Sequence, residues 1–340
     1  MSRHNFINSI HIGRRAKAKE NLPNNWESLD INNLTLPKGK TVFMFGGNTT
    51  TNTYTANGNA KAIESLLDKD QLEKTNILSF YYDDEPFNNK GILSKDYVEN
   101  AEHVFEKIFK PMIFDRKGNM KEMKGIEQVF DNMVLSAHCG GSAFVSIIIN
   151  KFYDTLLENY PPNTAKFLIN KIQYFAYAPN RLPDHNVNAF IITPFADTSC
   201  SWSSAITLAE NDKVEIDYPK GTIKKLIKAR TQGNFMNESY NEFQKSRALM
   251  FRSGNSTYAI PSQMNPDTCI GDHSIECIYK PHLINSGTDY AITATAMHYA
   301  ARQYLRAFLT SGAIDAKGIF SKTTEMLEKN KPLPQKNPSK

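Results

Sequence analysis

Cysteine is scarce in this sequence, and so are long apolar runs. The 340 residues contain four cysteines, Cys139, Cys200, Cys269 and Cys277, which are too few for a disulfide-stapled scaffold and typical of reduced thiols in a cytoplasmic protein. No stretch reaches the roughly 18 consecutive apolar residues that a membrane-spanning helix needs. The polar stretch MSRHNFINSIHIGRRAKAKE at the beginning lacks the apolar core of a signal peptide. We therefore expect a cytoplasmic protein without a transmembrane segment, although its polar ends would also suit delivery into another cell.

A strong charge of one sign is also missing. The formal net charge is +5 with an isoelectric point near 8.8, and the basic residues are spread along the chain. Because nucleic-acid binding needs a clustered basic face, we expect no nucleic-acid partner. The lysine-rich segment Lys220–Lys228 is interpreted as a solvated helix face rather than as a site for anionic membranes or acidic substrates.

Apolar runs of strand length alternate with helical patterns through the middle of the chain. Such alternation predicts parallel strands joined by helical crossovers, and near-continuous apolar strands indicate a sheet covered on both faces. We therefore predict an α/β fold with a mostly parallel central sheet and helices on both faces. The expected strands are 41–47, 76–82, 133–138, 172–178, 188–196 and 248–253, and the expected helices are 55–67, 94–109, 144–157, 165–171 and 288–309.

The two ends and one internal segment depart from this pattern. Residues 1–38 and 313–340 are polar and show no core pattern, so they are interpreted as an N-terminal extension and a C-terminal tail. Residues 211–247 are charged and interrupt the alternation, which favours a helical, lid-type insertion. The predicted domain therefore spans residues 39–312 and contains that insertion.

One stretch, VLSAHCGGSA (residues 134–143), combines a strand, a cysteine and two glycines. A strand that turns sharply into a helix projects one side chain outward at the turn, and the neighbours of this side chain must be small. Ala137, Gly140 and Gly141 meet that requirement around Cys139. The beginning of the following helix also favours a thiolate. The stretch therefore marks Cys139 as a candidate nucleophile.

This stretch resembles the nucleophile turn, or elbow, of the α/β-hydrolase superfamily. AHCGGSA is similar to the lipase-type elbow GHSxGGA with a cysteine in place of the serine, as in the dienelactone-hydrolase branch, and Ala137 replaces the usual first glycine. The resemblance covers the order of elements from about residue 40 to residue 310. It implies an α/β-hydrolase-like fold with no cofactor and no metal.

The resemblance implies a catalytic triad in the chain order nucleophile, acid, histidine. The acid should follow the strand two after the elbow strand, and Asp197 follows the expected strand 188–196. The histidine should lie in a loop after the last strand, and His273 lies between the last expected strand and the long final helix. The implied triad is therefore Cys139, Asp197 and His273, in which His273 is the base and Asp197 orients it.

The resemblance also implies an oxyanion hole. One donor would be the backbone N–H of Gly140, and the other would come from the stretch FMFGGNTTT as the N–H of Gly47 or Asn48. These donors would stabilise the tetrahedral intermediate of acyl transfer. The implied reaction is hydrolysis or acyl transfer on an ester, thioester or amide, so the implied partner is a small acyl or ester substrate or an acylated protein.

The triad residues also have simpler interpretations. Cys139 fits a small buried residue in a strand–helix turn, and Asp197 fits a helix cap. Asp184 and Asp212 are weaker substitutes for the acid. His273 fits a histidine in a surface loop.

Three other functions compete with the hydrolase. A degenerate hydrolase fold would act as a protein-interaction module, which the non-serine elbow and the polar tails motivate. A caspase-like peptidase would use His138 and Cys200, although His138 is otherwise interpreted as structural. Cys269, His273 and Cys277 are spaced four apart, as metal ligands on one helix face would be, but Gly271 interrupts a helix and no fourth ligand is evident.

Overall fold

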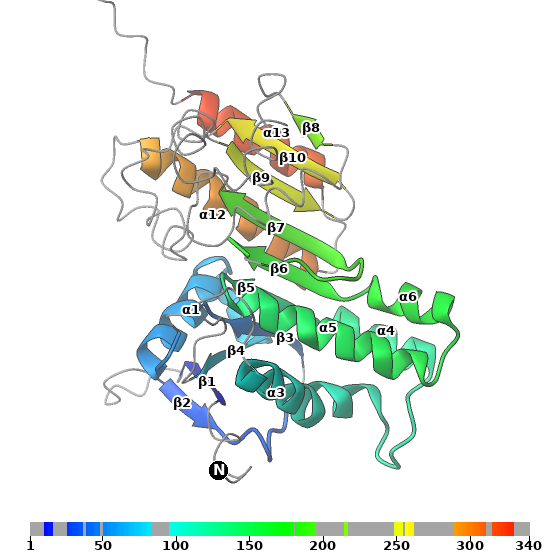
Figure 1. The fold of residues 1–340 in the computed structure, drawn as a ribbon. Coiled ribbons are helices and arrows are strands. Elements are labelled where there is room, and N and C mark those ends of the chain that lie inside the picture. Colours follow the sequence, from blue (N-terminus) through cyan, green and yellow to red (C-terminus); the bar gives the residue numbers. More distant parts are fainter. Residues whose placement is uncertain are drawn as a thin grey trace, which may run out of the picture.

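The computed structural model describes residues 10–15, 26–36, 39–47, 50–82, 95–179, 181–194, 214–216, 248–253, 256–261, 289–310 and 315–329. Its strands are β1 (Ile10–Arg15), β2 (Trp26–Leu29), β3 (Lys40–Phe45), β4 (Thr75–Tyr82), β5 (Met133–His138), β6 (Gln173–Tyr177), β7 (Asn188–Pro194), β8 (Val214–Ile216), β9 (Ala248–Ser253) and β10 (Ser256–Pro261). These described strands form one ten-stranded sheet in the order β2-β1-β4-β3-β5-β6-β7-β9-β10-β8, which runs through the whole of Figure 1.

The middle of the sheet is parallel. The strands β4, β3, β5, β6 and β7 run in the same direction, whereas β1 pairs antiparallel with β4, and β9 pairs antiparallel with β7. Every residue of β5 is buried, as expected for a strand covered on both faces. The predicted parallel centre is confirmed for these five strands, and their carboxyl ends share one edge of the sheet, here called the carboxyl edge.

Helices cover both faces of this parallel centre (Figure 1). They are α1 (Thr53–Ser65), α2 (Lys69–Lys74), α3 (Lys95–Val104), α4 (Met123–Asp131), α5 (Gly141–Leu157), α6 (Pro162–Ile169), α12 (Asp289–Leu309) and α13 (Ala316–Lys329), and α3 continues through a π-helical turn (Phe105–Phe109) and a 3₁₀ turn (Lys110–Ile113). Alternate residues of β3 face opposite sides, because side chains of a strand point alternately to its two faces. Phe43 and Phe45 belong to the core under α3 and α5, and Val42 and Met44 belong to the core under α1 and α12. The predicted α/β architecture with helices on both faces is thus confirmed.

The N-terminal segment, expected to be irregular, contains two strands. Ile12 of β1 pairs with Phe80 of β4, and β2 pairs with β1 in turn. Ile10 and Ile12 are buried, which is the alternation of a strand with one face on the core. The expectation of a polar, irregular extension is wrong for these residues. The strand was missed because IHIGRR holds only two core side chains among polar ones.

The other departures lie toward the C-terminus. Residues 313–340 were expected to be a tail, yet they include α13, whose Ile319 is buried in the same core as Tyr304 of α12. β10 replaces an expected loop and pairs antiparallel with β9. Of the predicted lid, 211–247, only β8 is described, and it pairs parallel with β10. The remainder of that segment lies outside the described residues. None of the described helices is long and apolar enough to cross a membrane.

Candidate active site

Cys139 occupies the turn between β5 and α5. Its φ is +50°, in the left-handed region that most side chains avoid at a cost of about 1–2 kcal/mol. Its N–H donates to the carbonyl of Tyr177 at 3.3 Å, so pairing with β6 continues up to the turn. Gly140 already has helical angles, with φ −55° and ψ −30°. The reversal from strand to helix is therefore made at the residue that carries the thiol.

Gly141 lets the beginning of α5 lie directly against the end of β3. A Cβ on Gly141 would lie 2.2 Å from the carbonyl oxygen of Phe45 and 2.5 Å from that of Gly46. No side chain fits there, because both neighbours are backbone atoms. The motif thus requires a small residue here for a steric reason, because α5 approaches the loop after β3 closely.

Gly47, in that loop, packs against the thiol. A Cβ on Gly47 would lie 2.7 Å from the Cβ of Cys139, 3.2 Å from its Sγ and 3.5 Å from Nδ1 of His138. The structure therefore brings Gly47, Cys139 and Gly140 together, although they come from two separate segments of the chain. The backbone of the β3 loop, the thiol and the first residue of the helix form one cluster at the carboxyl edge.

Two buried tyrosines lie behind this cluster. Tyr82 of β4 donates its hydroxyl to the carbonyl of Gly46, and Tyr97 of α3 donates to the carbonyl of Gly140 at 3.0 Å. Burial raises the pKa of both tyrosines, and negative charge on Cys139 adds to the rise. Both hydroxyls therefore stay protonated near neutral pH and act as donors. Sequence reasoning missed them, because tyrosines at such positions are typical of an ordinary core.

Ser142, in the first turn of α5, forms hydrogen bonds with the backbone of the elbow. Its hydroxyl donates to the carbonyl of Cys139 at 2.6 Å, and its N–H donates to the same oxygen at 3.1 Å. The hydroxyl also accepts the N–H of Arg181 at 3.1 Å. Since Ser142 is fully buried, these bonds link the elbow firmly to the segment between β6 and β7.

His138 lies beside the thiol rather than away from it. Its imidazole stacks on the ring of Tyr177, with centroids 5.8 Å apart and an interplanar angle of 18°, and its side chain is mostly buried. Its Nδ1 and the Sγ of Cys139 both border Gly47. The stacking is consistent with a structural histidine, yet its position places the imidazole beside Cys139.

A second strained residue lies at the same edge. Ala178, directly after β6, has a φ of +45°, and its N–H donates to the carbonyl of Ile192 in β7 at 2.8 Å. Within the described residues, Cys139 and Ala178 are the non-glycine residues with positive φ, and they follow neighbouring strands. Backbone strain of this kind gathers at functional sites, which points to the carboxyl edge around β5 and β6.

The other predicted site residues are not described. Asn48, Asp197 and His273 lie outside the described residues, as do the alternative residues Asp212, Cys200, Cys269 and Cys277. β7, whose last residue is Pro194, is separated from β5 by one strand and ends at the carboxyl edge. Asp184 is described and is engaged elsewhere, because its carboxylate pairs with Arg181 at 3.1 Å and accepts from Asn150 at 2.9 Å.

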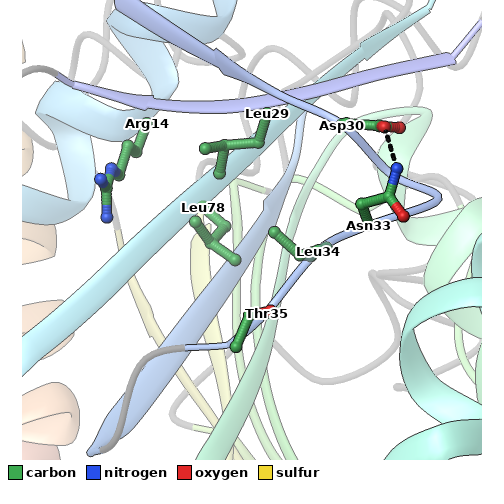
Figure 2. Close-up of a pocket in the computed structure, with 7 residues that line it drawn as sticks. All are labelled: Arg14, Leu29, Asp30, Asn33, Leu34, Thr35 and Leu78. Atoms are coloured by element: carbon green, nitrogen blue, oxygen red, sulfur yellow. Dashed lines mark hydrogen bonds between the residues drawn. The ribbon is translucent and has the colours of Figure 1, made fainter.

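A cavity elsewhere in the fold offers no such chemistry. It measures about 150 Å³, lies between β1, β2 and β4, and holds a hydrogen bond from Asn33 to Asp30 of 2.6 Å (Figure 2). Its arginine already makes a salt bridge to Glu27 at 2.8 Å. Its lining residues are Arg14, Leu29, Asp30, Asn33, Leu34, Thr35 and Leu78. None of these belongs to the cluster around Cys139.

No protein-family model and no curated protein matches this sequence. Among the described residues, no group of three or more His, Cys, Asp or Glu side chains could hold a metal ion. The candidate functional site is therefore the cluster of Gly47, Cys139 and Gly140 with its buried supports, Tyr82, Tyr97 and Ser142.

Proposed function

We propose that this chain is a cysteine-dependent hydrolase or acyltransferase of the α/β-hydrolase kind, acting on an ester, thioester or amide. The observation that carries the proposal is the left-handed Cys139 at the end of a central parallel strand, with the backbone of Gly47 packed on its side chain. A strained turn from strand to helix presents a nucleophile in this way. The order of elements supports Asp197 and His273 as the partners of Cys139.

In the proposed reaction, His273 takes the proton of Cys139, and Sγ attacks the carbonyl carbon of the substrate. The π electrons of the carbonyl move to its oxygen, which the N–H groups of Gly140 and of Gly47 or Asn48 stabilise. Collapse of this intermediate breaks the bond to the leaving group, which takes the proton from His273, and an acyl-cysteine remains.

Water completes the hydrolytic cycle. It attacks the acyl carbon and gives one proton to His273, and the second tetrahedral intermediate expels the Cys139 thiolate and releases the carboxylic acid. Asp197 holds the imidazole in the productive tautomer and stabilises its positive charge. In an acyltransferase, an acceptor alcohol, thiol or amine replaces the water.

The test is hydrolysis of p-nitrophenyl acetate and of a simple acetyl thioester by the full chain. We expect Cys139→Ala and His273→Ala each to lower kcat by ~10³-fold or more, and the double variant to be no slower than either, because triad members act as a unit. His138→Asn is the matched control, since a structural histidine leaves the rate within a few-fold. Full activity in Cys139→Ala, or loss in His138→Asn equal to that in His273→Ala, would contradict the proposed triad.

Burial of Cys139, which is 4% exposed, favours a second candidate, a hydrolase-like fold that binds a protein partner without catalysis. A folded wild-type chain that hydrolyses neither probe would support this candidate. The caspase-like alternative depends on Cys200, so loss of activity in Cys200→Ala with full activity in Cys139→Ala would favour that alternative instead.

A further inference from the structure

We propose that Tyr82 and Ser142 are positioning residues that aim the two backbone N–H groups of the oxyanion hole, those of Gly47 and Gly140. This inference rests on the proposed function and deepens it. Neither side chain is proposed to touch the substrate. Each acts through a peptide unit whose other end faces the thiol cluster.

The first peptide unit joins Gly46 and Gly47. A trans peptide is planar, and its C=O and N–H point in opposite directions. Tyr82 donates its hydroxyl to the carbonyl oxygen of Gly46, which fixes the rotation of this unit about the chain. The N–H of Gly47 is therefore directed away from the buried tyrosine, and the α-carbon of Gly47 lies against Cys139.

The second peptide unit joins Cys139 and Gly140. Its carbonyl oxygen accepts the hydroxyl of Ser142 at 2.6 Å and the N–H of Ser142 at 3.1 Å. By the same planarity, the N–H of Gly140 is directed away from α5. Each proposed oxyanion donor is thus the N–H end of a planar peptide unit, and a buried hydroxyl group holds the carbonyl end of the same unit.

The two supporting side chains, Tyr82 and Ser142, keep their positions during the reaction. Tyr82 and Ser142 are both fully buried, and burial raises the pKa of Tyr82, so this hydroxyl keeps its proton when Cys139 becomes negative. Donors held in place before the reaction need no reorganisation as the negative charge develops.

The test uses the full chain with p-nitrophenyl acetate and, in parallel, iodoacetamide. Alkylation by iodoacetamide forms no oxyanion, whereas acyl transfer does. We expect Tyr82→Phe and Ser142→Ala each to lower kcat for p-nitrophenyl acetate by ~10- to 100-fold at nearly unchanged KM, with the rate of alkylation of Cys139 unchanged. Tyr174→Phe is the matched control, because this buried tyrosine of β6, the strand beside β5, has a hydroxyl without a partner in the described part of the chain, and we expect no effect on kcat.

The outcomes separate this inference from the proposed function. Absence of Cys139-dependent turnover in the wild-type chain overturns both. Wild-type turnover with unchanged kcat in Tyr82→Phe and Ser142→Ala overturns the positioning role alone. Equal losses of acyl transfer and alkylation also overturn it, since they would place the effect on the thiol. If one of the two variants does not fold, the other decides by the same comparison.

Discussion

At the scale of single residues, the site could be found in part from the sequence. Ala-His-Cys-Gly-Gly indicated a sharp turn because strand-to-helix reversals need small neighbours, and the structure places the strained φ at Cys139. Tyr82 and Tyr97 could not be found in this way. Their hydroxyl groups contact backbone carbonyls of segments distant in the sequence, and no local spacing records such contacts.

Gly47→Ala tests the packing of the β3 loop on the thiol. The new Cβ would lie 2.7 Å from the Cβ of Cys139, so either the thiol or the loop must shift. We expect a loss of ~10²-fold in kcat/KM for p-nitrophenyl acetate, because small displacements of reacting groups are costly, and a loss of about 1–3 kcal/mol in the free energy of unfolding.

Gly125→Ala in α4 is the control for this substitution, since its Cβ would contact only side-chain atoms of Lys121, the nearest being the Cβ at 3.3 Å, and none of the cluster around Cys139. Activity should be unchanged in this control. Gly47→Ala with wild-type activity would show that the β3 loop is not part of the site.

At the scale of elements, continuous apolar runs allowed the central strands to be predicted from the sequence, whereas short strands near the sheet edges could not be predicted. The five central strands are buried on both faces, so their hydrophobicity is nearly unbroken and predicts them directly. β1 and β10 lie next to the edge strands β2 and β8 and pair antiparallel with β4 and β9, and only alternate residues of β1, Ile10 and Ile12, place large side chains in the core. Their six residues each leave too few periods for the alternation to be distinguished from a loop.

Gly141→Ala tests the joint between α5 and β3. Its Cβ would meet the carbonyl oxygen of Phe45 at 2.2 Å, and because the neighbour is backbone, relief requires moving the helix. We expect the free energy of unfolding to fall by about 3 kcal/mol or more, measured by urea denaturation.

Gly58→Ala in α1 is the matched control, because nothing lies within 4 Å of its Cβ. Alanine at this half-buried helical position, which has open space around the new Cβ, should raise the free energy of unfolding by about 0.5–1 kcal/mol. If both variants changed stability in the same direction, the steric account of the elbow would be wrong.

At the scale of the whole molecule, the long-range contacts join parts that sequence patterns treat separately. Asp68, between α1 and α2, accepts hydrogen bonds from Arg302 and, at 2.6 Å, from Arg306 of α12. Lys40 of β3 donates to the carbonyl of Phe308 at 2.5 Å. These contacts fasten α12 to β3 and to the residue between α1 and α2, and they could not be predicted because charged surface residues carry no periodic signal.

Asp68→Asn tests this fastening through its pH dependence. The hydrogen bond from Arg306 lowers the pKa of Asp68 below its ordinary value of 3.8. A carboxyl group with a depressed folded-state pKa contributes stability above its unfolded-state pKa and loses it as the pH falls through the folded-state value. We therefore expect the variant to have a lower Tm than the wild type at pH 7, with the difference shrinking once the pH falls below 3.8 and vanishing as the pH passes the lowered folded-state pKa of Asp68. A difference that is independent of pH would contradict the ion-pair origin.

The central claim is that Cys139 is a nucleophile held in an elbow, and trapping the acyl group tests it most directly. The wild-type chain would be mixed briefly with p-nitrophenyl acetate, quenched in acid and mapped by mass spectrometry of its peptides. We expect a single acetyl group on Cys139, formed in a burst with one equivalent of p-nitrophenol and absent in Cys139→Ala. Acetyl groups spread over lysines and the other cysteines, with no excess at Cys139, would contradict it.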